Sequence, residues 1–257
     1  MPTADAGHPH DDLSTQRHSA AHVLAEAVLE LFPDAKLGIG PAVEDGFYYD
    51  FDLPRTLTPD DLEAIEARMK EIIAADKPFS RRELARAEAL GYFGDAGQMY
   101  KVELIEALTG GASLGARDDL ATSNDAAALG ASGVSLYRQG GFEDLCAGPH
   151  VASTRHIGAI KLLRVAGAYW RGDEKRAQLQ RIYGTAWPTQ TDLDAYLWRL
   201  EEARKRDHRR LGTDLGLFQF SDQVGAGLPI WGEDGALLRS IVEDFWKVEH
   251  RAAGYQY

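Results

Sequence analysis

The sequence predicts a mixed fold of α-helix and β-sheet, and three observations favour this class. Residues 17–32 and 58–73 carry apolar side chains at helical spacing. Residues 134–187 lack this helical spacing and contain apolar segments typical of strands, separated by turn residues. A chain of 257 residues is also long enough to bury one substantial core and to hold a second, smaller unit.

The first helix is expected over residues 17–32, where Leu24, Val28 and Leu31 recur on one face and Pro33 closes the segment. Residues 1–16 precede this helix and are polar and acidic. We therefore expect these residues to form a flexible tail.

The second helix is expected to begin at Thr58, which caps it, with Pro59 at its first position and Asp60 at its positive end. Ile65 and Met69 lie on its apolar stripe. The pattern predicts an amphipathic helix packed on a core.

The next segments are less regular. Ser80 and Glu83 have the spacing of a capping box, which predicts a short helix ending at Gly91. Residues 100–108 fit either helix or strand, and residues 109–133 are rich in Ala, Gly, Ser and Asp. We interpret 109–133 as mostly loop, consistent with an insertion.

Strands are expected at 46–53, 157–165 and 178–187, and the pair Gly140-Gly141 indicates a hairpin. After them, residues 191–210 read as one long helix whose later part is basic, and residues 235–253 as an amphipathic helix.

Composition excludes several classes of protein. The net charge of −12, from 28 basic and 40 acidic residues, provides no global positive field for nucleic acid, so RNA would have to bind to local basic patches. A single cysteine excludes an internal disulfide framework. The sequence has neither a signal peptide nor an apolar run long enough to span a bilayer, so we expect a cytoplasmic protein with no membrane partner.

Two short motifs contain residues that are able to bind a metal ion or to act as acids and bases. His18 and His22 are four positions apart, as are Cys146 and His150, and on a helix that spacing stacks two side chains on one face. If the fold unites the motifs, three imidazoles and the only thiol converge. Such a cluster suits a tetrahedral metal site or a hydrolytic centre without metal. The alternative is two unrelated pairs, with Cys146 packed as a small apolar residue.

Longer stretches place these motifs in context. In chain order they are RHSAAHVLAEAV, KLGIGPAVEDGFYYDFDL, YKVELIEAL, DLCAGPHV, AGAYWRGDEKRAQLQRIYGTAW and LEEARKRDHRRLGTDLGLF. Together they resemble bacterial threonyl-tRNA synthetase from residue 17 to residue 218. The resemblance implies the editing domain of that family, shared in broad form with alanyl-tRNA synthetase, and an α+β fold with helices packed on antiparallel sheet.

The resemblance also implies a domain organisation and a reaction. We expect a tail at 1–16, the editing domain at 17–187, a linker helix at 188–214 and an incomplete start of a class II catalytic domain at 215–257. The implied reaction is hydrolysis of serine from mischarged tRNA(Thr), because a threonine pocket excludes the smaller serine by only ~1–3 kcal/mol. ATP-dependent charging is not expected from this chain alone.

Residue roles follow by matching family positions. The candidate catalytic residues are His18, His22, Lys101, Cys146 and His150. The candidate substrate-binding residues are Tyr49 and Asp144, of which Asp144 would hold the serine ammonium. The candidate tRNA contacts are Arg171, Lys175, Arg176 and Arg181. We expect Lys101 and His18 at the edge of a cleft, where removal of either side chain slows the reaction without unfolding the protein.

Cofactors and partners are also expectations. The threonyl branch implies editing by water without metal, although His18, His22, Cys146 and His150 would be the ligands if zinc is bound. ATP, magnesium and a catalytic-domain zinc are implied only for the full-length family enzyme, as is a homodimer. The expected partner is the tRNA(Thr) acceptor end carrying serine, and not DNA. Two alternatives stay open: a zinc-dependent hydrolase of another ester or amide, and a non-catalytic tRNA-binding fragment.

Overall fold

The computed structural model describes residues 9–109, 133–225 and 227–256. The chain divides into two compact units, with the boundary between Leu193 and Asp194. The predicted combination of helices and antiparallel sheet is confirmed.

The first unit contains a five-stranded antiparallel sheet with the order β1-β3-β8-β7, and β2 pairs with β3. Its strands are β1 (Lys36–Leu37), β2 (Ala42–Val43), β3 (Gly46–Asp52), β7 (Ala159–Tyr169) and β8 (Gln178–Trp187). The strands predicted at 46–53, 157–165 and 178–187 are β3, β7 and β8.

A second antiparallel sheet has three strands in the order β4-β5-β6. These are β4 (Phe79–Leu84), β5 (Val134–Gln139) and β6 (Phe142–Leu145). The predicted hairpin at Gly140-Gly141 joins β5 to β6, and Gly140 has a φ of +56° that favours glycine. Helices α3 (Arg86–Asp95) and α4 (Met99–Thr109) contribute to an apolar core with this sheet.

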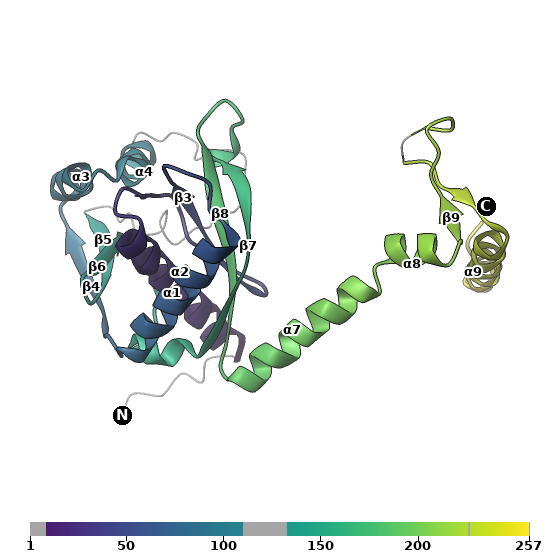
Figure 1. Cartoon of the computed structure of the whole chain (residues 1–257), viewed down its shortest axis with the longest axis horizontal. Helices are drawn as coiled ribbons and strands as arrows, with labels where there is room; N and C mark the ends of the chain where they lie inside the picture. The colour runs from purple at the N-terminus through teal and green to yellow at the C-terminus, as the bar shows by residue number, and fades with distance from the viewer. Residues whose placement is uncertain (1–8, 110–132, 226, 257) are drawn as a thin grey trace. The chain divides into compact units, whose positions relative to one another are not determined.

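Helix α1 (Pro9–Leu31) lies between the two sheets (Figure 1). One side of it packs with β3, β8 and α2 (Pro59–Ala74) in the larger apolar core. On the other side its residues contact the three-stranded sheet, as when Gln139 donates to the Glu26 carboxylate at 3.1 Å. The central position of α1 explains why its polar residues His18, Ser19 and His22 are buried.

Two predictions about helix boundaries are wrong. Helix α1 begins at Pro9, so residues 9–16 are helical and not part of a tail; proline is favoured in a first turn because its missing N–H has no intrahelical partner there. Residues 79–84 form strand β4, which pairs along its whole length with β5. The helix of this region, α3, begins at Arg86 and ends at Asp95, not at Gly91, and at its start the Ala85 N–H donates to Glu88 Oε2 at 3.1 Å.

Other boundaries are resolved by the structure. The predicted capping box of α2 is present, with Thr58 accepting from the Asp61 N–H. The ambiguous stretch 100–108 is helical, within α4. The loop predicted at 109–133 lies almost wholly outside the described residues, because 110–132 are not described.

The expected long helix at 188–214 is two helices. Helix α7 (Gln190–Lys205) crosses the boundary between the units, and α8 (His208–Asp214) follows it. Asp207 separates them, because its ψ of 119° is not helical and its side chain accepts from the Arg209 N–H.

The second unit continues with β9 (Phe218–Gln219), β10 (Ile230–Trp231) and α9 (Glu233–Ala252). Helix α9 is amphipathic, and its apolar side chains Leu237, Ile241 and Phe245 are exposed. In the part of the chain that the structure describes, no helix combines the length and apolar character needed to cross a bilayer.

Candidate functional site

The two motifs meet inside the first unit. Helix α1 carries His18 and His22 one turn apart, and the loop after β6 carries Cys146 and His150. One donor atom from each of the four side chains lies within 4.8 Å of the other three. The alternative of two unrelated pairs therefore does not describe this molecule.

Cys146 lies at the centre of the cluster. Its Sγ is 3.3 Å from Nε2 of His18 and 3.3 Å from Nε2 of His150. The backbone N–H of Gly148 donates to the same sulfur at 3.1 Å. Two imidazole nitrogens and an amide hydrogen thus converge on one fully buried sulfur atom.

Aromatic rings enclose His150. Its ring is stacked on His18 with a centroid distance of 4.3 Å, and on Phe79 with a centroid distance of 4.7 Å. The ring of Tyr137 lies 4.5 Å away. These contacts fix the plane of the imidazole, which is the least buried of the four clustered groups.

A backbone acceptor assigns the tautomer of His18. Its Nδ1 lies 3.1 Å from the carbonyl oxygen of Pro149, which can only accept. Nδ1 therefore carries the hydrogen in the neutral ring, and the lone pair of Nε2 points toward Cys146.

Burial keeps the imidazoles neutral. Loss of solvation and, to a smaller extent, the charge of Lys101 lower the pKa of His18 to about 4, although the hydrogen bond to Pro149 acts in the opposite direction. Burial and the charge on His18 lower the pKa of His150 to about 2. The pKa of His22 is well below its usual value for the same principal reason. At neutral pH these rings are therefore unprotonated.

A second buried cluster consists of Lys101, Asp144 and Tyr49. Lys101 Nζ is 3.0 Å from Oδ1 and 3.1 Å from Oδ2 of Asp144, and the Tyr49 hydroxyl donates to the same carboxylate. Asp144 lies two positions before Cys146, so both side chains project to one side of this extended segment.

The position of Lys101 corrects the sequence prediction. The side chain is 0% exposed and ion-paired, not at a cleft edge, because α4 packs against the three-stranded sheet. His18 is also buried, with 3% of its surface exposed. The Asp144 carboxylate, proposed as a receptor for an ammonium group, already binds one ammonium in this structure.

The basic residues proposed to contact tRNA differ in availability. Arg171 and Arg176 both bind the Glu103 carboxylate, at 3.0 and 2.7 Å. Arg181 pairs with Asp50 at 2.7 Å and is nearly buried. Lys175 is exposed.

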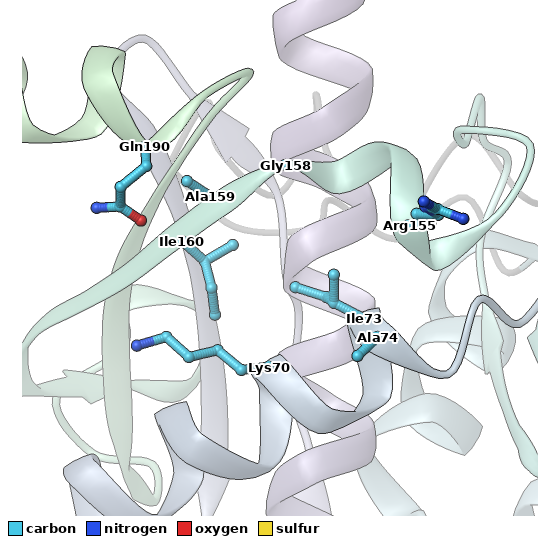
Figure 2. Close-up of a pocket in the computed structure, with 8 residues that line it drawn as sticks. All are labelled: Lys70, Ile73, Ala74, Arg155, Gly158, Ala159, Ile160 and Gln190. Carbon is cyan, nitrogen blue, oxygen red and sulfur yellow. The ribbon is translucent and has the colours of Figure 1, made fainter.

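A separate pocket of about 580 Å³ lies between the end of α2, the start of β7 and Gln190 (Figure 2). Its lining includes Lys70, Arg155 and apolar side chains such as Ile160, and none of the clustered histidines. This pocket is distinct from the histidine–cysteine cluster.

The donor set is compatible with a metal ion. The sulfur of Cys146 lies 3.3 Å from each of two Nε2 atoms, which is about the separation expected between a sulfur and a nitrogen ligand of tetrahedral zinc. His22 supports this fit, because its buried Nδ1 has no hydrogen-bond partner within the described part of the chain. If zinc were bound through three of the four side chains, it would supply a Lewis acid and lower the pKa of a water in the fourth position.

Sequence analysis missed the groups that hold the ligands in place. These are the Ser19 hydroxyl, the Pro149 carbonyl, and the rings of Phe79 and Tyr137. Ser19 is detectable in principle, because it lies within the first motif. Phe79 and Tyr137 reach His150 only through strand pairing, which has no local signal in the sequence.

Comparison with known proteins gives a family match that covers part of this site. Residues 134–183, which include Cys146 and His150, match the family described as the threonyl and alanyl tRNA synthetase second additional domain.

The longer matches are to threonine–tRNA ligases. The chain is 56% identical over 243 residues to a threonine–tRNA ligase of Pelobacter propionicus, covering 95% of this chain and 35% of that protein. It is 54% identical over 239 residues to the enzyme of Geobacter sp. (93% and 34% covered), and 51% identical over 251 residues to that of Dehalococcoides mccartyi (98% and 39%). The chain is homologous to threonine–tRNA ligases over nearly all its residues, and it spans about a third of the length of these relatives.

Proposed function

We propose that this chain hydrolyses the ester that joins serine to the terminal ribose of tRNA(Thr), an editing reaction. The observation that carries the proposal is the convergence of His18, His22, Cys146 and His150 in a chain homologous to threonine–tRNA ligases. Threonine–tRNA ligases need a second site, since the missing methyl group of serine gives only ~1–3 kcal/mol of discrimination.

The neutral imidazoles provide the proton acceptor for this reaction. A water oxygen forms a bond to the ester carbonyl carbon while a histidine accepts the water proton. The bond to the ribose oxygen then breaks and that oxygen takes up a proton, which releases serine and a free terminal hydroxyl. His150 is the member most accessible to substrate, because it is the least buried of the four.

Lys101 supplies positive charge near the reacting groups. Its ammonium is close enough to lower the pKa values of His18 and His22, so its field extends over the cluster. A fixed positive charge in a region of low dielectric stabilises the negative oxygen of a tetrahedral intermediate. In this proposal Asp144 and Tyr49 hold Lys101 in place.

A pair of histidine variants tests the proposal. His150→Asn removes an acceptor from the cluster, whereas His156→Asn changes an exposed histidine of the same unit. We expect the first to slow release of serine from Ser-tRNA(Thr) by about 10²–10⁴-fold and the second to leave it unchanged. Equal rates for both variants, with both folded, would contradict the proposal.

A second candidate is a zinc-dependent hydrolase, favoured by the four-ligand set. Zinc would draw its ligands from His18, His22, Cys146 and His150, with one position left to water, and the enzyme would act on esters or amides without requiring tRNA. Stoichiometric zinc together with indifference to tRNA would distinguish it from the editing reaction. The non-catalytic alternative predicts tRNA binding with the ester intact.

The remaining assignments follow from the editing proposal. The substrate is the serine-bearing acceptor end of tRNA(Thr), held through local basic residues such as Lys175, and the reaction takes place in the cytoplasm. For the longer relatives, the homodimer, the use of ATP and magnesium, and the linker helix leading to a catalytic domain all remain predictions.

A further inference from the structure

We propose that Ser19 is a positioning residue that holds His150 as the Nδ1–H tautomer, with the Nε2 lone pair directed at Cys146 and the reacting space. Its effect on rate rests on the editing function proposed above, whereas the tautomer itself does not.

The Ser19 hydroxyl uses its hydrogen and one lone pair on backbone groups. It has one hydrogen and two acceptor lone pairs. It donates to the Thr15 carbonyl oxygen at 2.8 Å, one turn earlier in α1. It accepts from the Val151 N–H at 3.1 Å.

The third contact of Ser19 is to His150. Nδ1 of His150 lies 3.0 Å from Oγ, and the single hydroxyl hydrogen is already used on Thr15. The hydrogen between Oγ and Nδ1 must therefore belong to the ring. A neutral imidazole with a hydrogen on Nδ1 has its lone pair on Nε2, which lies 3.3 Å from Cys146 Sγ.

Ser19 also links the two motifs physically. It lies on α1 between His18 and His22, and it bonds both His150 and the backbone that follows it. Because Ser19 is fully buried, water does not readily replace its hydroxyl. One side chain thus sets the tautomer of His150 and its approach to α1.

Nitrogen NMR of isotope-labelled histidines tests the tautomer without tRNA. The ring signals of His150, among eight histidines, are assigned by their loss in His150→Asn. We expect a protonated Nδ1 and a bare Nε2 in the unaltered chain, and loss of this fixed pattern in Ser19→Ala. A hydrogen on Nε2 in the unaltered chain, or an unchanged pattern in Ser19→Ala, would overturn the proposal.

Thr154→Val is the matched control for loss of a buried hydroxyl. Thr154 Oγ1 donates to the Ile72 carbonyl oxygen at 3.0 Å and accepts from the Lys77 N–H at 3.0 Å, as Ser19 does with its backbone partners, but it is not hydrogen-bonded to a histidine. This variant should keep the His150 pattern. If Thr154→Val disturbs the pattern as much as Ser19→Ala does, the effect is general destabilisation and the proposal fails.

Deacylation supplies the second readout. Ser19→Ala should slow hydrolysis of Ser-tRNA(Thr) by about 10- to 100-fold, as is usual for groups that orient a functional imidazole. Ser19→Thr keeps a hydroxyl that can bond the carbonyl one turn earlier, and it should restore both the NMR pattern and most of the rate. An unaltered chain that shows the predicted tautomer but no hydrolysis would contradict the editing function and leave the tautomer assignment standing. A folded Ser19→Ala variant with full activity would contradict the positioning role.

Discussion

Nε2 of His18 lies 3.3 Å from Sγ of Cys146, although 128 positions separate the two residues in the chain. The contact exists because α1 lies between two antiparallel sheets and the loop after β6 ends against α1. The proposed function depends on this contact between the two motifs.

The buried pair Lys101–Asp144 should be important for stability. Lys101→Met leaves the Asp144 carboxylate, 1% exposed, without its nearest cation, and breaking such a pair costs about 3–5 kcal/mol. Chemical denaturation measures this loss. The control Lys205→Met removes an exposed ion pair with Glu202 and should change stability by about 1 kcal/mol at most. A normal unfolding midpoint for Lys101→Met would show that the pair is not buried in solution.

Stability should fall as the solution becomes mildly acidic. The pKa of His18 is lowered from 6.5 to about 4, so between these values the unfolded chain binds a proton that the folded chain does not. The free energy of unfolding therefore rises with pH through this window and falls as the pH decreases below about 6.5. Denaturation at a series of pH values from 7 to 4 measures the slope. His18→Asn should make the slope shallower, and an identical slope in this variant would exclude His18 as a source.

Metal removal separates the two candidate reactions. In the editing proposal the imidazoles accept the proton, so chain treated with a chelator should retain hydrolysis of Ser-tRNA(Thr). Elemental analysis before and after treatment establishes the zinc content. Loss of activity with the metal, and recovery on adding zinc but not in Cys146→Ser, would favour the zinc hydrolase instead.

Salt should weaken tRNA binding, and Lys175 should contribute to this dependence. The chain carries a net charge of −12, so binding relies on a few local cations. Lys175→Ala should reduce affinity and make the slope of log affinity against log salt shallower by about one. The comparison is Lys247→Ala, which changes a partly exposed lysine of the second unit that pairs with Asp244. Equal slopes in the two variants would remove Lys175 from the interface.

Some elements that depend on neighbouring residues were predicted correctly from the sequence. Thr58 with Pro59 predicted the start of α2, and Gly140-Gly141 predicted the β5–β6 hairpin. The same local reasoning misassigned residues 79–84, because Ser80 and Glu83 satisfy a capping pattern while β4 is stabilised by pairing with β5, about fifty positions away.

The candidate site was also predicted only in part from the sequence. Spacing alone grouped His18 with His22 and Cys146 with His150. Spacing could not show that Lys101 is buried, because its burial depends on how α4 packs on the three-stranded sheet. Strand β4 of that sheet precedes α4 in the chain, and strand β5 follows it. Nor could spacing identify the ring of Phe79 stacked on His150.

The most direct test of the central claim compares hydrolysis of Ser-tRNA(Thr) and Thr-tRNA(Thr) by this chain under single-turnover conditions. We expect the serine ester to be cleaved rapidly and the threonine ester to be largely spared, and we expect His150→Asn to abolish most of the difference. Absence of serine release at high protein concentration, or cleavage of both esters at the same rate, would contradict the central claim.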